Sequence, residues 1–272
     1  MAIWDKITSR GNVEDRRGMP MAVGGGLGIG GLAVVLAITY LSGGDLGDVL
    51  SQIDPNQIVQ EQPAQDASQF EGEDSYEVFA SSVLGSANDV WVRIFAEEGE
   101  EYVGPKLVLF RALTESSCGN ASAQVGPHYC TLDKTIYLDE TFFEELTNRL
   151  GAKGGDVAEA YVIAHEVGHH VQNLLGTNQG VSSNEDSVKL ELQADCYAGI
   201  WANSLKDQNV FEVGEIGEAM DAAEAVGDDR IQEKVTGQVN PESWTHGSSA
   251  DRVDWFTKGY DAGSFEACDT FK

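Results

Sequence analysis

Two histidines and a glutamate stand close together in an apolar stretch of this chain. His165 and His169 are four residues apart, and Glu166 directly follows the first histidine. Side chains four residues apart lie on the same face of a helix, so both imidazoles are placed to bind one zinc ion. At this spacing the glutamate reaches a water molecule on the metal. The motif therefore predicts a catalytic zinc site with Glu166 as its base.

The residues around the motif are typical of one helix, which we expect to run from Asp156 to Leu175. Asp156 is a candidate N-cap, and Gly176 supplies a stop after the last apolar position. So short a motif also arises by chance on the solvent face of a helix. Its position in the middle of an amphipathic segment favours the zinc site over that alternative. The apolar positions are Val157, Tyr161, Val162, Ala164 and Val171.

A third zinc ligand is expected on a second helix. A catalytic zinc has three protein ligands and leaves its fourth position to water. Glu191 lies 22 residues after His169, within a helical segment from about Asp186 to Leu205, and Asp195 stands one turn later. We expect Glu191 to bind the metal and Asp195 to accept the spare ring N–H of a zinc histidine. The alternative for both residues is an exposed acidic helix face.

These segments resemble the gluzincin metallopeptidases, whose pattern is H-E-x-x-H followed by E-x-x-x-D on a later helix. Residues 161–166, 169–173, 190–199 and 241–252 look like the bacterial family of putative neutral zinc metallopeptidases. The resemblance covers the predicted membrane segment and most of residues 75–272. It implies a zincin-like fold and one Zn²⁺ ion more strongly than it implies a substrate, which we expect to be a peptide or protein.

Residues 245–252 also resemble the T-H-P-x-x-x-x-R element of membrane-linked gluzincins. That resemblance implies that His246 and Arg252 face the substrate beside the zinc, although Gly247 replaces the proline. A protonated or hydrogen-bonding group at these positions would stabilise negative charge on the substrate carbonyl. The alternative is that Ser248 or Ser249 caps a helix and that His246 only occupies the preceding turn.

The expected activity is hydrolysis of a peptide bond. Zinc lowers the pKa of bound water to about 7 and polarises the scissile carbonyl. Glu166 is expected to act first as general base on water and then as general acid to the leaving amine. The alternative is a zinc-stabilised binding or scaffold protein of the cell envelope with little or no hydrolysis. Glu166 favours the enzyme, because a structural metal site does not need a base.

A second signal lies near the N-terminus, where residues 21–41 form an uncharged run long enough to span a bilayer of about 30 Å. Basic residues precede this run, and the next one after it is Arg93. The positive-inside rule then places segment 1–20 in the cytoplasm, segment 21–41 in the membrane as an anchor, and the peptidase domain 75–272 outside the cytoplasm. The acidic residues 42–74 bury too little apolar surface to fold alone and are expected to form a tether. A cleavable signal peptide is the rival interpretation. The basic residues are Lys6, Arg10, Arg16 and Arg17.

The four cysteines all follow the apolar run, which agrees with an oxidising compartment. Four cysteines allow three pairings, and the local bridge expected first is Cys118 with Cys130. Cys196 with Cys268 would then tie the Glu191 helix to the C-terminus. A cysteine zinc site is disfavoured, because the spacings do not fit and a His/His/Glu set is already present.

The net charge of −28 argues against nucleic acid as a partner, since phosphate binding relies on basic patches. The expected partners are a peptide or protein substrate and, through residues 21–41, the lipid bilayer. A solvated acidic surface is the simplest account of the remaining charge.

The fold class expected is α+β, a mostly helical domain with a small β-sheet. Helices are expected at 76–97, 140–150, 213–225 and 249–260 besides the two that carry the zinc ligands, and strands at 106–111 and 135–138. Zincins hold an extended substrate by adding it to a sheet edge, and the strand Thr135–Leu138 is the candidate edge.

Overall fold

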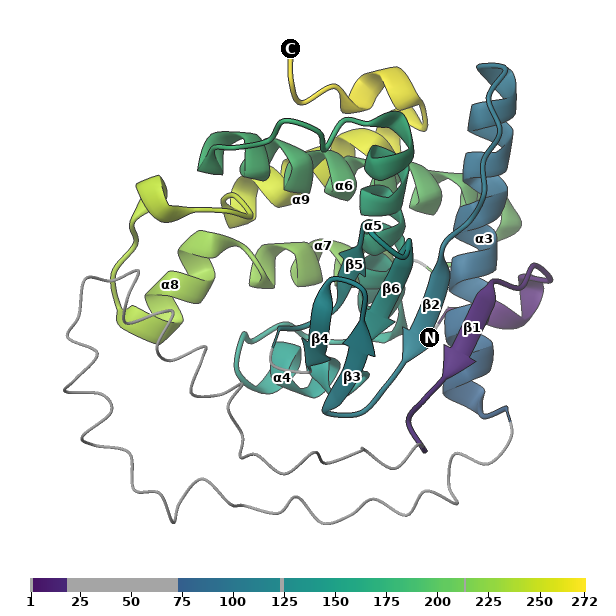
Figure 1. Ribbon diagram of the computed structural model, residues 1–272, viewed down its shortest axis with the longest axis horizontal. Helices are drawn as coiled ribbons and strands as arrows, with labels where there is room; N and C mark the ends of the chain where they lie inside the picture. The colour runs from purple at the N-terminus through teal and green to yellow at the C-terminus, as the bar shows by residue number, and fades with distance from the viewer. Residues whose placement is uncertain (1, 19–72, 123–124, 213) are drawn as a thin grey trace.

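The computed structural model describes residues 2–18, 73–122, 125–212 and 214–272. These residues form seven α-helices, one four-stranded sheet and a separate β-hairpin (Figure 1). The sheet and the long helix α3 lie on one side of the molecule and α9, α7 and α8 on the other (Figure 1). Helix α6 reaches from that other side to α3, where Trp201 donates to Ser86. The predicted α+β class is confirmed.

The sheet has the strand order β1-β2-β6-β5. Strands β1 (Asn12–Asp15), β2 (Lys106–Leu109) and β6 (Thr135–Leu138) are parallel, and β5 (His128–Cys130) runs antiparallel to β6. Strand β6 is buried between two neighbours, so its assignment as the edge strand was wrong. Among the described residues β5 is the outer strand on that side. Strands β3 (Leu113–Ser116) and β4 (Gly119–Ser122) form the hairpin.

The predicted helices are present with small shifts at their ends, and one further helix, α8, was not predicted. The segment 156–175 forms a helix over its whole predicted length, although Asp156 is its first residue rather than its cap. Gly176 ends that helix in the left-handed conformation, with φ 73°. The bounds are α3 Ser75–Glu97, α4 Phe142–Asn148, α5 Asp156–Leu175, α6 Asn184–Ser204, α7 Ile216–Ala225, α8 Asp228–Thr236 and α9 Ser249–Ala262.

Glycines bring the helices around the motif unusually close together. A Cβ atom on Gly168 in α5 would lie 3.0 Å from the Cα of Ala194 in α6. Between α6 and α9 the approach is closer still, because a Cβ on Gly199 would collide with the Phe256 carbonyl and one on Gly259 with the Cys196 carbonyl. The three helices therefore pack backbone to backbone. This close packing fixes the positions of the side chains between them along each helix axis.

The N-terminal residues belong to the folded domain. Strand β1 pairs with β2 along its full length, so the folded unit includes residues 2–18 together with residues 73–272. The predicted domain, residues 75–272, leaves out residues 2–18, which the structure places in the same folded unit. The apolar run 21–41 and the tether up to residue 72 lie outside the described residues. Within the described part of the chain, no helix is both long and apolar enough to cross a membrane.

Both expected disulfides are present. Cys118 is bonded to Cys130 and joins the hairpin to β5, while Cys196 is bonded to Cys268 and joins α6 to the C-terminal segment. The second bridge begins one residue after Asp195, so it holds the part of α6 that faces the zinc motif.

Candidate metal centre

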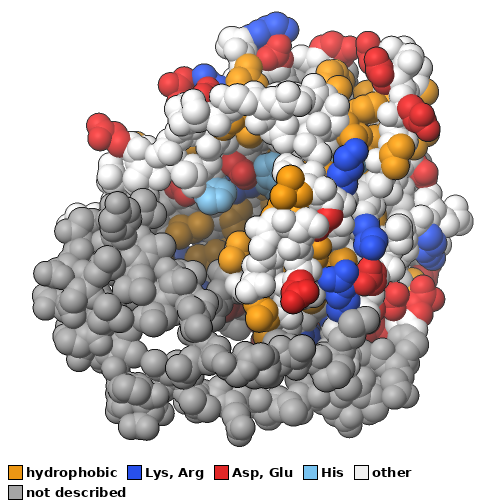
Figure 2. All heavy atoms as spheres, in the orientation of Figure 1, with side chains coloured by type: hydrophobic (Ala, Val, Ile, Leu, Met, Phe, Trp, Pro, Cys, Tyr) orange, Lys and Arg blue, Asp and Glu red, His pale blue; other side chains and the backbone are white. Residues whose placement is uncertain are grey.

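The structure brings the three predicted ligands together. Helix α5 presents His165 and His169 on one face, and α6 crosses it with Glu191 directed at both imidazoles. Among the described residues this is the one group of at least three candidate ligands whose atoms converge, all within 4.8 Å of one another. Figure 2 shows histidine and acidic side chains gathered in a hollow of this face.

Each imidazole nitrogen lies near a different oxygen of Glu191, at a separation close to that between two ligands of one zinc ion. Glu191 Oε2 lies 3.2 Å from His165 Nε2, and Glu191 Oε1 lies 3.4 Å from His169 Nε2. Atoms bound about 2.0 to 2.2 Å from a tetrahedral zinc are roughly 3.3 to 3.6 Å from one another. The donor set, two imidazoles and a carboxylate, is also the set that catalytic zinc takes. The residues present therefore fit the metal.

The other nitrogen of each imidazole is already occupied. His165 Nδ1 donates to Asp195 Oδ1 at 2.8 Å, as the sequence predicted for Asp195. His169 Nδ1 donates to Gln172 Oε1 at 2.9 Å, and Gln172 in turn donates to the Leu190 carbonyl. These bonds orient both rings so that Nε2 is directed at the site and is available to a metal ion. Sequence reasoning missed Gln172, although its spacing of three residues from His169 places it on the same helix face.

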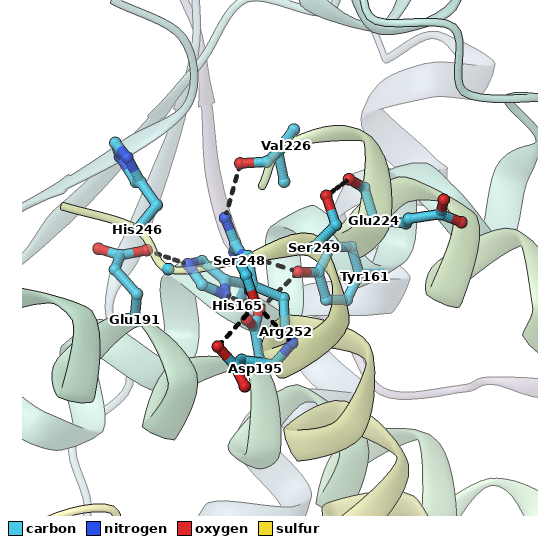
Figure 3. A network of polar contacts seen from close by, with 12 residues as sticks. Tyr161, His165, Glu191, Asp195, Glu224, Val226, His246, Ser248, Ser249 and Arg252 are labelled. Atoms are coloured by element: carbon cyan, nitrogen blue, oxygen red, sulfur yellow. Dashed lines mark hydrogen bonds and ion pairs between the residues drawn. The ribbon is translucent and has the colours of Figure 1, made fainter. Parts of the chain in front are cut away.

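Arg252 lies on the opposite side of His165 from Glu191 and contacts Asp195 (Figure 3). Its Nε donates to Asp195 Oδ2 at 2.8 Å and its Nη2 to Asp195 Oδ1 at 3.0 Å. Tyr161 completes the cluster, with its hydroxyl 2.5 Å from Asp195 Oδ1. The guanidinium is almost fully buried, so we assign Arg252 to holding Asp195 and not to contact with the substrate.

The charges at the site favour a cation between the imidazoles. Burial alone would lower the pKa of His165, but the carboxylates of Asp195 and Glu191 outweigh burial and raise that pKa to about 10. Burial would likewise raise the pKa of Glu191, yet the two histidines hold it well below its usual value. The space between these groups therefore attracts positive charge, either protons or a divalent ion that replaces them.

Glu166 is buried beside the ligands, on the same helix. Its Oε2 atom is shielded from solvent and has no hydrogen-bond partner among the described residues. A buried carboxylate oxygen without a partner is costly to the fold. An oxygen placed this way suits a group that takes a proton from a water molecule entering the site.

His246 lies in the loop before α9, and its side chain is 50% exposed. The loop packs on α6 around the third ligand, because a Cβ on Gly247 would contact Val188 and Leu192. Figure 3 places His246 on the same side of His165 as Glu191. Ser248 also caps α9 by accepting from the amide of Asp251, so the alternative interpretation of this segment is correct for the cap.

Asp228, the first residue of α8, anchors this loop, and sequence reasoning missed it. Its Oδ2 accepts from the amides of Thr245, His246 and Gly247 at 2.7, 2.6 and 3.0 Å. Its Oδ1 lies 3.2 Å from His246 Nδ1. The next residue, Asp229, binds the amide and hydroxyl of Ser249. Two adjacent carboxylates thus fix the loop, and only Asp228 touches the histidine ring.

The sequence similarities of the chain extend well beyond these residues. Residues 2–271 match the sequence model of the family described as "Putative neutral zinc metallopeptidase". The chain is 41% identical over 285 residues to the Escherichia coli (strain K12) protein named "Uncharacterized protein YpfJ", and the match covers 98% of each chain. It is 44% identical over 250 residues to "Uncharacterized protein Rv2575" of Mycobacterium tuberculosis (strain H37Rv), covering 85% of this chain and 84% of that protein. No solved structure matches the chain.

Proposed function

The chain belongs to the family of putative neutral zinc metallopeptidases, and from this premise we propose that it hydrolyses peptide bonds with one zinc ion held by His165, His169 and Glu191. One observation carries the proposal. Both imidazoles turn Nε2 toward the Glu191 carboxylate while Asp195 and Gln172 occupy the opposite nitrogens. This arrangement supports a gluzincin-type centre.

The chemistry requires a metal, a base and a donor to the carbonyl oxygen. When bound, zinc supplies a Lewis acid for the scissile carbonyl and lowers the pKa of water to about 7. Glu166 removes a proton from the attacking water and delivers it to the leaving amine as the C–N bond breaks. A protonated His246 would donate Nδ1–H to Asp228 and Nε2–H to the carbonyl oxygen as negative charge develops there.

The unpartnered oxygen of Glu166 supports an enzyme over a zinc-stabilised scaffold. A scaffold gains nothing from a buried carboxylate that lacks a hydrogen bond, whereas a peptidase needs that oxygen for water. We further propose that an extended substrate adds to β5, the outer strand next to α5. Tyr129 of β5 contacts the zinc helix through His170 and Asn173.

We propose that the catalytic domain works outside the cytoplasm and associates with a membrane through residues 21–41. The two disulfides support an oxidising compartment, since such bonds are rare in the cytosol. The net charge of −28 supports a solvated protein that does not bind nucleic acid.

The test is zinc analysis combined with a peptide-library cleavage assay on the full chain. Glu166→Gln should retain one zinc per chain and lose at least about 100-fold in activity. Glu159→Gln is the matched control, because Glu159 lies two turns earlier on α5 and takes no part in the site. A wild-type protein that binds zinc but cleaves no peptide would favour the scaffold instead.

A further inference from the structure

The N-terminal segment is hydrogen-bonded into the sheet. Strand β1 pairs in parallel with β2 in the register Asn12↔Lys106 to Asp15↔Leu109. The next amide, that of Arg16, donates to the Leu109 carbonyl at 2.7 Å. Lys106 and Arg16 both form ion pairs with Glu14 of β1 and so neutralise the negative charge of its carboxylate. The pairing therefore involves both backbone and side chains.

Helix α3 is shaped to receive the same segment. The amide of Gly11 donates to the Ser81 carbonyl at 2.7 Å, and the Ser81 hydroxyl donates back to the Gly11 carbonyl at 3.0 Å. A Cβ on Gly85 would lie 2.6 Å from the backbone nitrogen of Arg10. A side chain at Gly85 would therefore push the N-terminal segment off the helix.

The first residues also support the zinc helix. The amide of Ala2 and the indole N–H of Trp4 both donate to Asp156 Oδ2, at 2.9 and 2.7 Å. Asp156 begins α5, where a carboxylate stabilises the positive end of the helix dipole. The ring of Trp4 packs edge-on against Phe79 and Phe211. Residues 2–4 thus connect the start of the zinc helix to the core.

The chain leaves the domain and returns to it at one point. Arg17, whose side chain is 1% exposed, forms ion pairs with Asp15, Asp74 and Glu140 at 2.7, 2.8 and 3.1 Å. Asp74 in turn caps α3 through the amide of Glu77. The last residues before the apolar run are therefore in contact with the first residues after the tether.

We propose that residues 2–18 stay in the mature protein and lie on the same side of the membrane as the zinc site. A strand paired to β2 and a buried arginine paired to Asp74 require one compartment for both segments. A single crossing by residues 21–41 would separate them. Cleavage after that run would remove β1, its ion pairs and both hydrogen bonds to Asp156.

The basic residues that suggested a cytoplasmic N-terminus have another use. Arg16 and Arg17 bind carboxylates of the domain. Arg10 donates to the carbonyls of Ile7 and Ser9, and Lys6 donates to the carbonyl of Asn209. The positive-inside rule counts the lysines and arginines that flank a span and does not consider the contacts they make in the folded chain. In the proposed topology the four basic residues lie on the same side of the membrane as the zinc site, contrary to the prediction from that rule.

Cysteine labelling in cells tests this inference, and it does not depend on peptidase activity. Thr8→Cys introduces a thiol at an exposed position of the N-terminal segment, and Ser264→Cys introduces one at an exposed position near the C-terminus. The four native cysteines are in disulfides and do not compete. Each full-length variant is treated with a membrane-impermeant maleimide before and after permeabilisation, and a denatured sample defines complete labelling.

Equal labelling of the two positions is the expected result. Labelling of both in intact spheroplasts supports one shared exterior compartment. Labelling of both positions only after permeabilisation still supports one shared side of the membrane. In that case the shared side, and with it the zinc site, is the cytoplasm. Labelling of Ser264→Cys without Thr8→Cys in intact spheroplasts overturns the proposal. So does an intact mass of the purified wild type that lacks residues 2–18.

Discussion

Two histidine–aspartate pairs lie near the metal centre, and they are held in different ways. His165 and Asp195 sit between packed helices, with Asp195 fully buried and bound by Arg252 and Tyr161. His246 and Asp228 sit at a loop, with the imidazole half exposed and Asp228 bound by backbone amides. The buried pair fixes a metal ligand in one position. The exposed pair leaves a ring free to meet a substrate.

The negative charge of each aspartate is balanced by different groups in the two pairs. Burial would raise the pKa of Asp195, but the Arg252 guanidinium and His165 hold it below its usual value. Burial would also raise the pKa of Asp228, and there His246 and the amides of the loop lower it. The first pair depends on a full opposite charge from another helix, and the second depends on the conformation of its own loop. Mutations in the two pairs should therefore have different effects on stability and on catalysis.

The largest effect is expected from breaking the buried pair. Arg252→Met leaves the Asp195 carboxylate buried without its counter-ion, and the free energy of unfolding should fall by about 3 to 5 kcal/mol. Urea unfolding measures this, with Arg149→Met as the control. Arg149 pairs with Glu145 on the surface, so its loss should cost less than about 1 kcal/mol. Equal effects of the two substitutions would contradict the assigned role of Arg252.

The exposed pair should affect catalysis and spare stability. His246→Ala should lower kcat by about 100- to 1000-fold, the usual loss when one donor to the developing oxyanion is removed. Zinc content and the free energy of unfolding should stay at wild-type values, since the ring is half exposed and is not a ligand. Loss of zinc from this variant would show that His246 belongs to the metal site instead.

A third histidine, His170, is buried and has no acidic partner among the described residues. Its Nε2 donates to the Val103 carbonyl and its Nδ1 accepts from the Tyr129 hydroxyl. Burial lowers the pKa of His170 to about 4. The unfolded chain, with a pKa near 6.5, binds a proton that the folded chain does not, so stability is full above about pH 6.5 and falls toward pH 4.

This histidine should therefore account for about 2 kcal/mol of the stability lost between about pH 8 and pH 5. His170→Gln keeps a donor for Val103 and removes that titration. Urea unfolding of both proteins in a chelator, at the two pH values, gives the difference directly, because the other histidines are common to both. An unchanged pH slope in the variant would contradict a neutral His170.

The smallest effect is expected from the anchor of the loop. Asp228→Asn keeps an acceptor for the amides but weakens the charged bond to His246, worth about 1.5 kcal/mol, so kcat should fall roughly tenfold. Asp229→Asn is the matched control, since Asp229 binds the same loop through Ser249 alone. In the His246→Ala background Asp228→Asn should have no further effect on kcat. A full effect there would mean that Asp228 acts only through the loop.

The convergence of His165, His169 and Glu191 could be predicted from the sequence because its signals are local. His165, Glu166 and His169 all lie on one helix, so their relative positions follow from the spacing in the sequence. The apolar pattern shows where this helix runs, and Gly176 marks its end. Glu191 and Asp195 are one turn apart on a second helix. The role of Arg252 could not be read in the same way, because it depends on the close approach of α6 and α9 at Gly199 and Gly259.

The sheet was harder to predict. Strand β1 has the sequence Asn-Val-Glu-Asp, which lacks the apolar alternation of a strand, and it is held by pairing and by ion pairs instead. Without β1, the strand 135–138 looked like an edge rather than an inner strand. Asp228 was missed for a related reason, since it acts through backbone amides of a loop that no side-chain pattern marks.

The most direct measurement is zinc K-edge absorption spectroscopy on the purified full chain, together with its metal content. We expect one zinc per chain with two imidazoles and one carboxylate as protein ligands, and about one further oxygen from water at the fourth position. His169→Ala should lower the zinc content, whereas Glu166→Gln should leave both the content and the spectrum unchanged. A protein without zinc, or a site closed by a fourth protein ligand, would contradict the account.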